Sequence, residues 1–196
     1  MEDTPAVSLS DRIAQNVREL RAARGLSLDE LATQCSVSRS MISLIERGES
    51  SPTAVVLEKL ATGLGVPLAS LFEAPGAAPA PVSRLADQLL WRDPASGYVR
   101  RNVSPPGFAS PIQIVEVAFP AGARVSYETA ARTPRVHQQV WVLEGSISIA
   151  LGDERHRLNA GDCLAMVLDR PMSYHNPTRK PARYAVVITT DTAPWR

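Results

Sequence analysis

The chain has 196 residues, enough for two modest hydrophobic cores, because single domains centre on roughly 100–150 residues and about 70 can fold alone. No apolar run approaches the roughly 18 residues needed to span a bilayer, and residues 1–10 are acidic, so we expect a cytoplasmic protein without membrane contact. Cys35 and Cys163 stand far apart and form no Cys-x-x-Cys motif, which predicts neither a disulfide framework nor a zinc site.

Charge is divided unevenly along the chain. Residues 1–73 hold seven Arg and Lys against ten Asp and Glu, a net charge of −3, whereas residues 74–196 carry +4. The first part therefore lacks the overall basic character that draws many proteins to phosphates. Any contact of this part with nucleic acid must come from individually placed arginines and from helix N-termini.

The first part of the chain predicts short helices. Apolar residues recur at three- and four-residue intervals from Asp11, and Gly25 ends this amphipathic pattern. Ser27 and Glu30 have the capping-box spacing, which predicts a second helix from this point to about residue 34. After a short turn at residues 35–37, Ser38 is placed to cap a third helix.

The third predicted helix has two distinct sides. Its apolar side is Met41, Ile42 and Ile45, and its polar side is Arg39, Ser40 and Ser43. Gly48 ends it. Ser51 and Pro52 are expected to begin a fourth helix with a side-chain cap and a proline at the first helical position, and residues 67–72 form a short fifth. The core-facing residues expected in the fourth are Val55, Val56, Leu57, Leu60 and Leu64.

Five short helices with a three-residue turn between the second and third are the arrangement that places a third helix in a DNA major groove. The stretch from Ile13 through "RELRAARGLSLDELATQCSVSRSMISLIERGESSPTAVVLEKLATGLGVPLASLF" closely resembles the XRE-type (Cro/repressor-like) helix-turn-helix. The resemblance implies that Arg39, Ser40 and Ser43 read bases. Arg39 is the strongest of these, because a guanidinium can donate two hydrogen bonds to guanine, although it could be a solvated surface arginine.

Other polar residues of this part have two interpretations. By resemblance to the family, Glu46 and Arg18 form an internal ion pair between the first and third helices. The cap residues Ser27, Ser51 and Thr53 stabilise helix starts, and a capped helix N-terminus can also bind phosphate. The full set of candidate DNA-contacting residues is Ser27, Ser38, Arg39, Ser40, Ser43, Arg47, Ser51 and Thr53.

A domain boundary is expected in the proline- and alanine-rich stretch "EAPGAAPAPVS", which cannot build a core and predicts an extended linker. The expected divisions are a flexible N-terminus at 1–9, a helical domain at 10–73, a linker at 74–84, an all-β domain at 85–190 and a tail at 191–196. Strand-like runs at residues 112–119, 140–143, 146–150 and 184–189 alternate with turn signals and predict a sandwich or barrel.

The spacing of these strands and turns resembles the cupin barrel, a jelly-roll with two sequence motifs, here "HQQVWVLEGSISIALG" and "LNAGDCLAMVLDRPMSYHNP". In metal-binding cupins, three histidines and a glutamate point inward. Alignment on Gly145 puts Gln138 at the glutamate and leaves no histidine pair near residues 132–134. Alignment on Asn176 puts Met172 at the later histidine. An amide and a thioether are poor ligands for a first-row divalent ion, so no metal or other cofactor is expected.

Without a metal, the interior should be a small-molecule pocket with a few polar groups. Period-two alternation sends Gln138, Val140 and Val142 inward and Gln139, Trp141 and Leu143 outward, where Trp141 suits a subunit contact. Arg135 could neutralise an anionic ligand, and His137 and His175 could form a shifted metal site or lie at the rim. The candidate ligand-binding residues are Gln138, Val140, Met166, Met172, Tyr174, Arg135, His137 and His175.

The sequence thus predicts a multi-domain α plus β protein with an N-terminal all-α five-helix domain and a C-terminal all-β cupin barrel. The expected function is a homodimeric, non-enzymatic transcriptional regulator that reads a palindromic double-stranded DNA operator and binds a small-molecule effector. Two alternatives stay open: a cupin metalloenzyme with an appended helix-turn-helix, and a regulator whose barrel only dimerises.

Overall fold

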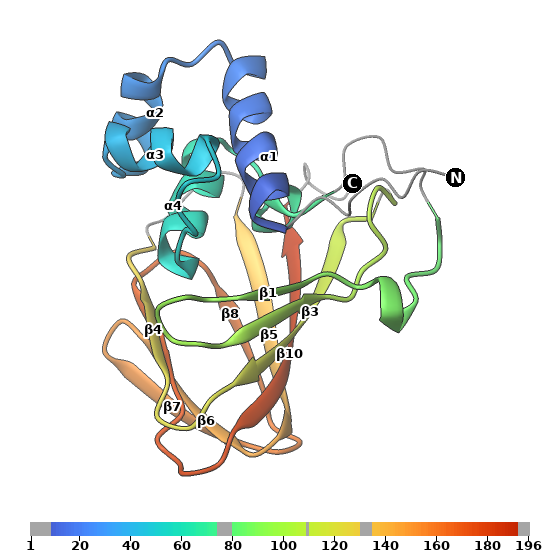
Figure 1. Cartoon of the computed structure of the whole chain (residues 1–196). Helices are drawn as coiled ribbons and strands as arrows, with labels where there is room; N and C mark the ends of the chain where they lie inside the picture. Colours follow the sequence, from blue (N-terminus) through green and yellow to red (C-terminus); the bar gives the residue numbers. More distant parts are fainter. Residues whose placement is uncertain (1–8, 74–79, 109, 130–134, 192–196) are drawn as a thin grey trace. The chain divides into compact units, whose positions relative to one another are not determined.

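The computed structural model describes residues 9–73, 80–108, 110–129 and 135–191. The chain divides into two compact units, Met1–Ala78 and Pro79–Arg196, called here the helical unit and the β unit (Figure 1). Residues 1–8, most of the predicted linker and residues 192–196 lie outside the described residues, as does the segment at 132–134. No helix among the described residues is long and apolar enough to cross a membrane.

The helical unit holds four α-helices and one 3₁₀ helix. The predicted fifth helix is this 3₁₀ turn, whose start at Pro67 has no side-chain cap. The elements are α1 (Leu9–Ala23), α2 (Leu28–Cys35), α3 (Arg39–Glu46), α4 (Ala54–Gly63) and η1 (Leu68–Leu71).

Side-chain caps define the helix starts. Ser27 and Glu30 form the predicted capping box at α2, and the Ser38 hydroxyl accepts from the Met41 amide at α3, as expected. The predicted start of α4 at Ser51 is wrong by two residues. Thr53 is the cap, and its hydroxyl accepts from the Val56 amide. A proline favours extended backbone in the residue before it, so the chain stays extended at Ser51 and turns helical only after Thr53.

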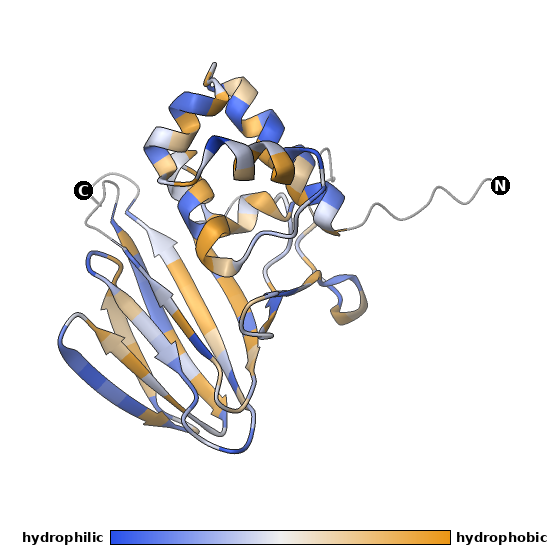
Figure 2. Cartoon of the chain, turned by 60° about the vertical axis from the view of Figure 1, so that its left-hand side comes forward, coloured by the Kyte–Doolittle hydropathy of each residue, from blue (hydrophilic) through white to orange (hydrophobic). Residues whose placement is uncertain are grey.

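The core of the helical unit follows the predicted periodicity. Val55 and Val56 differ from expectation, since both are only half-buried and Ala54 and Ala61 face the core instead. The hydropathy colours alternate around these helices (Figure 2). The fully buried large side chains here are Ile13, Leu31, Ile42, Ile45, Leu57, Leu60, Leu64, Leu71 and Phe72.

The β unit consists of a six-stranded antiparallel sheet, in the order β1-β2-β3-β10-β5-β8, and a four-stranded sheet, in the order β4-β9-β6-β7. The predicted closed barrel is therefore two sheets. A short 3₁₀ turn, η2 (Leu85–Asp87), precedes the strands. The strands are β1 (Leu90–Arg92), β2 (Val99–Asn102), β3 (Ile112–Phe119), β4 (Arg124–Tyr127), β5 (Val136–Glu144), β6 (Ser146–Leu151), β7 (Glu154–Asn159), β8 (Cys163–Val167), β9 (Met172–His175) and β10 (Ala182–Thr190).

Alternating burial places the core between the two sheets. The four strand-like runs of the sequence coincide with β3 or lie inside β5, β6 and β10. On β5, Val140 and Val142 are buried, whereas Trp141 is exposed, as the alternation predicts. Gly145 turns the chain between β5 and β6 with φ +76°, and a Cβ there would lie 2.9 Å from the Pro181 carbonyl oxygen. Only glycine fits both constraints.

Candidate DNA-binding surface and candidate ligand site

The turn between α2 and α3 gives the helical unit its helix-turn-helix geometry. Ser36 ends α2 in the left-handed conformation, with φ 51°, and Ser38 already caps α3. The chain therefore reverses within three residues. Val37, in the middle of this turn, is buried and joins the core. Packing of this residue and of Ile42 and Ile45 turns the opposite side of α3 outward.

The outward side of α3 carries the predicted base-reading residues. Arg39 and Ser40 are exposed and Ser43 is half-buried, so all three lie on one face near the N-terminal end of the helix. The Arg39 guanidinium is 62 % exposed and lies 3.3 Å from the Asp29 carboxylate at the start of α2. The Ser38 and Ser40 hydroxyls lie 3.2 Å apart. This face offers a guanidinium fork and hydroxyls at the end of the helix that recognition helices present to base edges.

Arg47 extends the same surface beyond the end of α3. Its guanidinium forms a bidentate pair with Glu49, at 2.7 and 2.9 Å, and donates to the Ser43 hydroxyl at 2.5 Å. The hydrogen-bonded Glu49 carboxylate raises the pKa of Arg47, and the arginine lowers the pKa of Glu49. Ser43 and Arg47 are thus already hydrogen-bonded to each other before any DNA contact.

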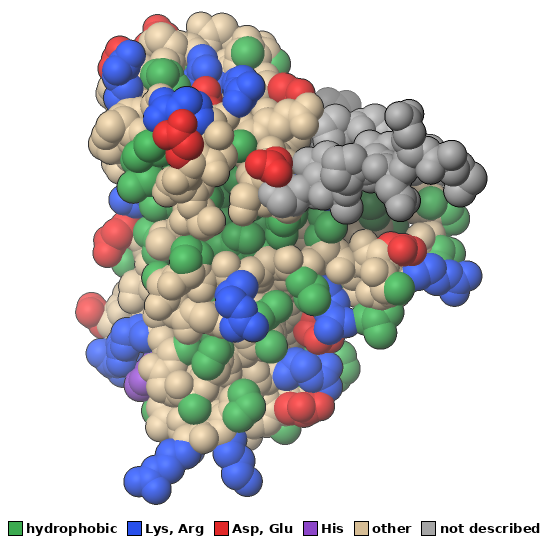
Figure 3. Space-filling model, viewed as in Figure 1, with side chains coloured by type: hydrophobic (Ala, Val, Ile, Leu, Met, Phe, Trp, Pro, Cys, Tyr) green, Lys and Arg blue, Asp and Glu red, His purple; other side chains and the backbone are tan. Residues whose placement is uncertain are grey.

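The predicted phosphate-binding caps differ in availability. The Ser27 amide donates to the Glu30 carboxylate at 2.7 Å, which holds the pKa of that carboxyl below its usual range, so the start of α2 has its own anion. Ser51 is exposed and precedes the helix start, and Thr53 caps α4. Acidic side chains lie among the basic ones on the view of Figure 3. Contacts here depend on single residues, as the charge count predicts.

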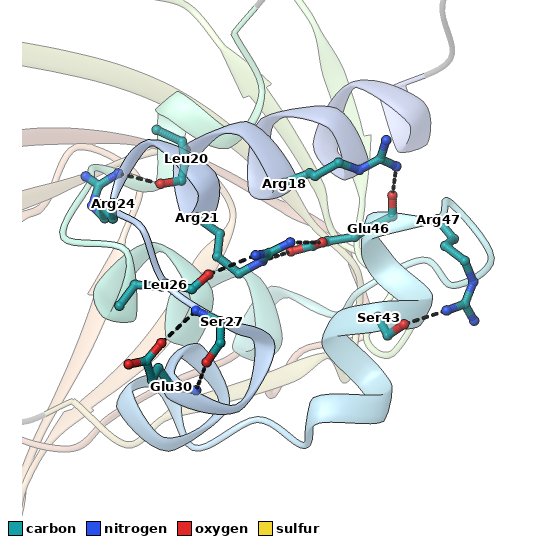
Figure 4. A network of polar contacts seen from close by, with 10 residues as sticks. All are labelled: Arg18, Leu20, Arg21, Arg24, Leu26, Ser27, Glu30, Ser43, Glu46 and Arg47. Carbon is teal, nitrogen blue, oxygen red and sulfur yellow. Dashed lines mark hydrogen bonds and ion pairs between the residues drawn. The ribbon is translucent and has the colours of Figure 1, made fainter.

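A buried ion pair fixes α3 against α1. The predicted partner of Glu46 was Arg18, and this is wrong: Arg21 forms the ion pair, with its Nε 2.6 Å and its Nη2 2.8 Å from the two carboxylate oxygens (Figure 4). Arg18 donates instead to the Glu46 backbone carbonyl, at the negative end of the α3 dipole. The two arginines share one face of α1, and Arg21 lies one turn nearer the carboxylate.

Five of the predicted ligand-binding residues meet between the sheets of the β unit. Val140 is fully buried, and Gln138, Met166, Met172 and Tyr174 are each 6–7 % exposed. The Gln138 side-chain amide donates to the Tyr174 hydroxyl at 2.5 Å, which links the two sheets. The positions that resemble cupin metal-ligand positions thus hold an amide and a thioether in a buried, mostly apolar setting.

A row of aromatic side chains in the same interior was not predicted. Tyr174 stacks on Tyr184 with ring centres 6.0 Å apart and planes within 6°. The row continues from Tyr184 through Phe119 to Tyr98. Trp91 meets Tyr98 edge-on, and Tyr127 meets Tyr174 in the same way. Several of these side chains come from short strands, β1, β2 and β4, which the sequence pattern did not indicate.

The other three predicted ligand-binding residues lie away from this interior. Arg135 is exposed just before β5. His137 faces out of the six-stranded sheet, with its Nε2 3.0 Å from the Asp191 carboxylate. His175 is on the outward side of the four-stranded sheet beside Arg124, and burial together with that arginine lowers its pKa. The two histidines belong to different sheets, so they do not form the shifted site considered above.

The described residues include no group of three or more His, Cys, Asp or Glu side chains that could hold a metal ion. The β unit therefore offers, among the residues that the structure covers, an interior of aromatic, aliphatic and amide groups. Such an interior can bind a small organic molecule by apolar contact and a few hydrogen bonds.

Comparison with known proteins agrees with the geometry of the helical unit. Residues 17–71 match the family model described as "HTH_3: Helix-turn-helix". The HTH-type transcriptional regulator SutR of Escherichia coli (strain K12) is 29% identical over 169 residues, which cover 86% of this chain and 89% of SutR. The chain is an XRE-type helix-turn-helix transcriptional regulator.

Two further matches describe how far this likeness extends. The crystal structure of an HTH_3 family transcriptional regulator from Vibrio cholerae has a TM-score of 0.77 to this regulator and 27% identity, covering 95% of this chain and 99% of that one. The uncharacterized regulator RghRB of Bacillus subtilis (strain 168) is 41% identical, but over 63 residues that are 32% of this chain and 45% of RghRB. The helical unit is thus shared widely, and the combination with a β unit is shared by fewer of these matches.

Proposed function

We propose that this regulator is a non-enzymatic, ligand-responsive homodimer. Its recognition helix α3 reads an inverted-repeat operator, and the interior of its cupin-like β unit binds a small effector without a metal. The observation that carries the proposal is the pairing of an exposed Arg39–Ser43 face on a rigidly held helix with an interior in which Gln138 and Met172 occupy metal-ligand positions. The first feature supports DNA reading, and the second supports binding without catalysis.

The outer face of the six-stranded sheet supports dimerisation. Ile112, Ile114 and Trp141 are 48 %, 37 % and 51 % exposed there. Ala185 and Val187 of β10 lie between the strands that carry them. Apolar side chains gathered on one face of a sheet are usually covered by a partner. A self-complementary contact between two copies would make the dimer symmetric, and two recognition helices would then require a symmetric operator.

The operator is expected to be an inverted repeat with half-sites about one helical turn, or a multiple of it, apart. In vitro selection from a random duplex library should recover such a motif, and sedimentation of the free protein should give a dimer. Trp141→Glu should shift the protein to monomer and weaken operator binding, because a carboxylate cannot be buried in an apolar interface without a partner. Leu90→Glu, on the short edge strand β1, is the matched control. A monomer protecting one asymmetric half-site would contradict the prediction.

Purified protein is expected to hold no stoichiometric divalent metal, and a chelator should leave its melting temperature unchanged. Native mass spectrometry should instead detect a retained or added small molecule. Met172→Trp should prevent the effector from changing operator affinity while leaving operator binding itself intact, because the side chain fills the interior of the β unit only. Met172→Leu, which keeps the volume, should respond like the wild type.

These measurements also separate the two alternatives. One zinc, iron or manganese ion per chain would overturn the metal-free site and favour a cupin metalloenzyme. A protein that binds operator as a dimer but shows no response to any small molecule, with Met172→Trp unchanged in every assay, would indicate a β unit that only dimerises.

A further inference from the structure

A buried arginine lies on the inner face of the six-stranded sheet. Arg100 on β2 is 7 % exposed. Its register neighbours are Trp91 on β1 and Val117 on β3, and Val117 in turn pairs with Tyr184 on β10; all three are buried. Among the buried residues of the described strands, Arg100 alone carries a formal charge. A guanidinium stays protonated at physiological pH, so the interior contains a permanent positive charge.

Tyrosine hydroxyls lie in the same interior. All four tyrosines of the chain are in the β unit, and the ring contacts described above connect them. Burial raises the pKa of Tyr127 and of Tyr184 well above the usual value, and neighbouring tyrosines raise both further. Arg100 acts on Tyr184 in the opposite direction, so its charge reaches that ring. The two hydroxyls therefore stay protonated and are able to donate hydrogen bonds.

We propose that the inner face of the six-stranded sheet binds a small organic monocarboxylate, whose carboxylate pairs with Arg100 and accepts from tyrosine hydroxyls and whose body packs on the aromatic row. This inference rests on the proposed effector function and names the chemical class of the effector. Burial of a charge is costly unless an opposite charge and hydrogen bonds compensate it, and a carboxylate supplies both.

The surrounding residues favour this class over others. A cationic ligand would be repelled by Arg100, and a neutral one would leave its charge uncompensated by the ligand. A dianionic phosphate calls for more positive charge than one guanidinium, whereas the planar fork of an arginine matches a carboxylate. Asp93, which is 2 % exposed after β1, accepts from the Ser96 amide and hydroxyl at 2.8 and 2.6 Å. Internal neutralisation of Arg100 by this carboxylate is the competing interpretation.

The test uses the full-length regulator with three matched sets of probes: benzoate and hexanoate, their primary amides, and the corresponding amines. Thermal shift and calorimetry measure binding, and operator affinity is measured with each probe at millimolar concentration. We expect the carboxylates to bind and the amides and amines to bind at least tenfold more weakly. Arg100→Gln should lose carboxylate binding at least tenfold, and Tyr184→Phe, which keeps the ring, should weaken it several-fold.

Arg101→Gln is the matched control, because Arg101 is the next residue of β2 and faces outward beside Glu116. It should bind the carboxylates like the wild type. If Arg100→Gln fails to fold by circular dichroism, Tyr184→Phe and Arg100→Lys, which should retain partial binding, decide the question.

The failures of the two proposals can be told apart. Equal binding of carboxylate and amide, equal binding by wild type and Arg100→Gln, or no carboxylate binding at all overturns the carboxylate site. If amides or amines then change operator affinity, the effector function stands without this ligand class. If carboxylates bind through Arg100 but operator affinity never changes, the site stands and the effector function fails.

Discussion

Arg21→Ala is expected to destabilise the helical unit by about 3 kcal/mol, the lower end of what breaking a buried ion pair costs. The reason is that Glu46 is only 6 % exposed and keeps its charge in the wild type against the Arg21 guanidinium. Removing the arginine leaves a buried carboxylate whose pKa rises. The deficit should be largest at neutral pH, where folding must keep that carboxylate charged, and should shrink as the pH falls through the raised pKa.

The distribution of aromatic residues lets one denaturation experiment measure this effect in each unit. None of the three tryptophans lies within residues 1–78, so tryptophan fluorescence follows the β unit, and circular dichroism at the helical minimum follows the helical unit. Arg21→Ala should move the second transition and leave the first in place. Arg24→Ala is the control, since Arg24 is exposed near the same helix end and donates to the Leu20 carbonyl.

A second variant isolates the charge. Glu46→Gln in the Arg21→Ala background should recover part of the lost stability, because an amide is cheaper to bury than an unpaired carboxylate. Equal destabilisation by Arg21→Ala and Arg24→Ala, or no recovery on adding Glu46→Gln, would show that the ion pair does not fix α3.

Arg39→Ala is expected to weaken binding to the selected operator by about 1–3 kcal/mol, roughly 5- to 150-fold, with little change on random-sequence DNA. The arginine lies at the exposed start of α3, where a guanidinium can reach the O6 and N7 of guanine. The measurement is a titration of fluorescent operator and of a scrambled duplex at a fixed salt concentration. Selection repeated with the variant should recover a motif with relaxed preference at one position of each half-site.

Asp29→Asn provides the complementary control, because it removes the carboxylate 3.3 Å from Arg39 without touching the arginine. It should retain operator preference. Loss of affinity by Arg39→Ala that is equal on both duplexes would make Arg39 a phosphate contact and not a base-reading residue.

Local patterns predicted the helical unit well because its starts and turns depend on neighbouring residues. Ser27 with Glu30, and Ser38 with its capped amide, need only a spacing of three residues. The partner of Glu46 could not be chosen in the same way. Arg18 and Arg21 lie on one face of α1, and only the crossing of α1 with α3 decides which of them reaches the carboxylate.

In the β unit, the alternation of long strands predicted the inward positions of Gln138 and Val140, but short strands gave no pattern. β1 has three residues and β2 has four, with three arginines between them, so Arg100 reads as a surface residue in the sequence. Its burial follows from the pairing of β2 with β3, a contact between distant parts of the chain. The aromatic row is likewise assembled from strands of both sheets, which no local window contains.

The ion pairs of the recognition surface affect how the regulator searches DNA. Asp29 and Glu49 lie against Arg39 and Arg47, so a phosphate must displace a carboxylate of the protein itself to reach either arginine. Each displacement leaves a carboxylate exposed near the negatively charged duplex, and cations recruited to it offset those released from the phosphate. The regulator should therefore stay only briefly on arbitrary sequences and depend less steeply on salt than its number of arginine contacts suggests. A cognate half-site compensates for the exchange through base contacts, so the acidic neighbours raise selectivity by shortening the unproductive encounters.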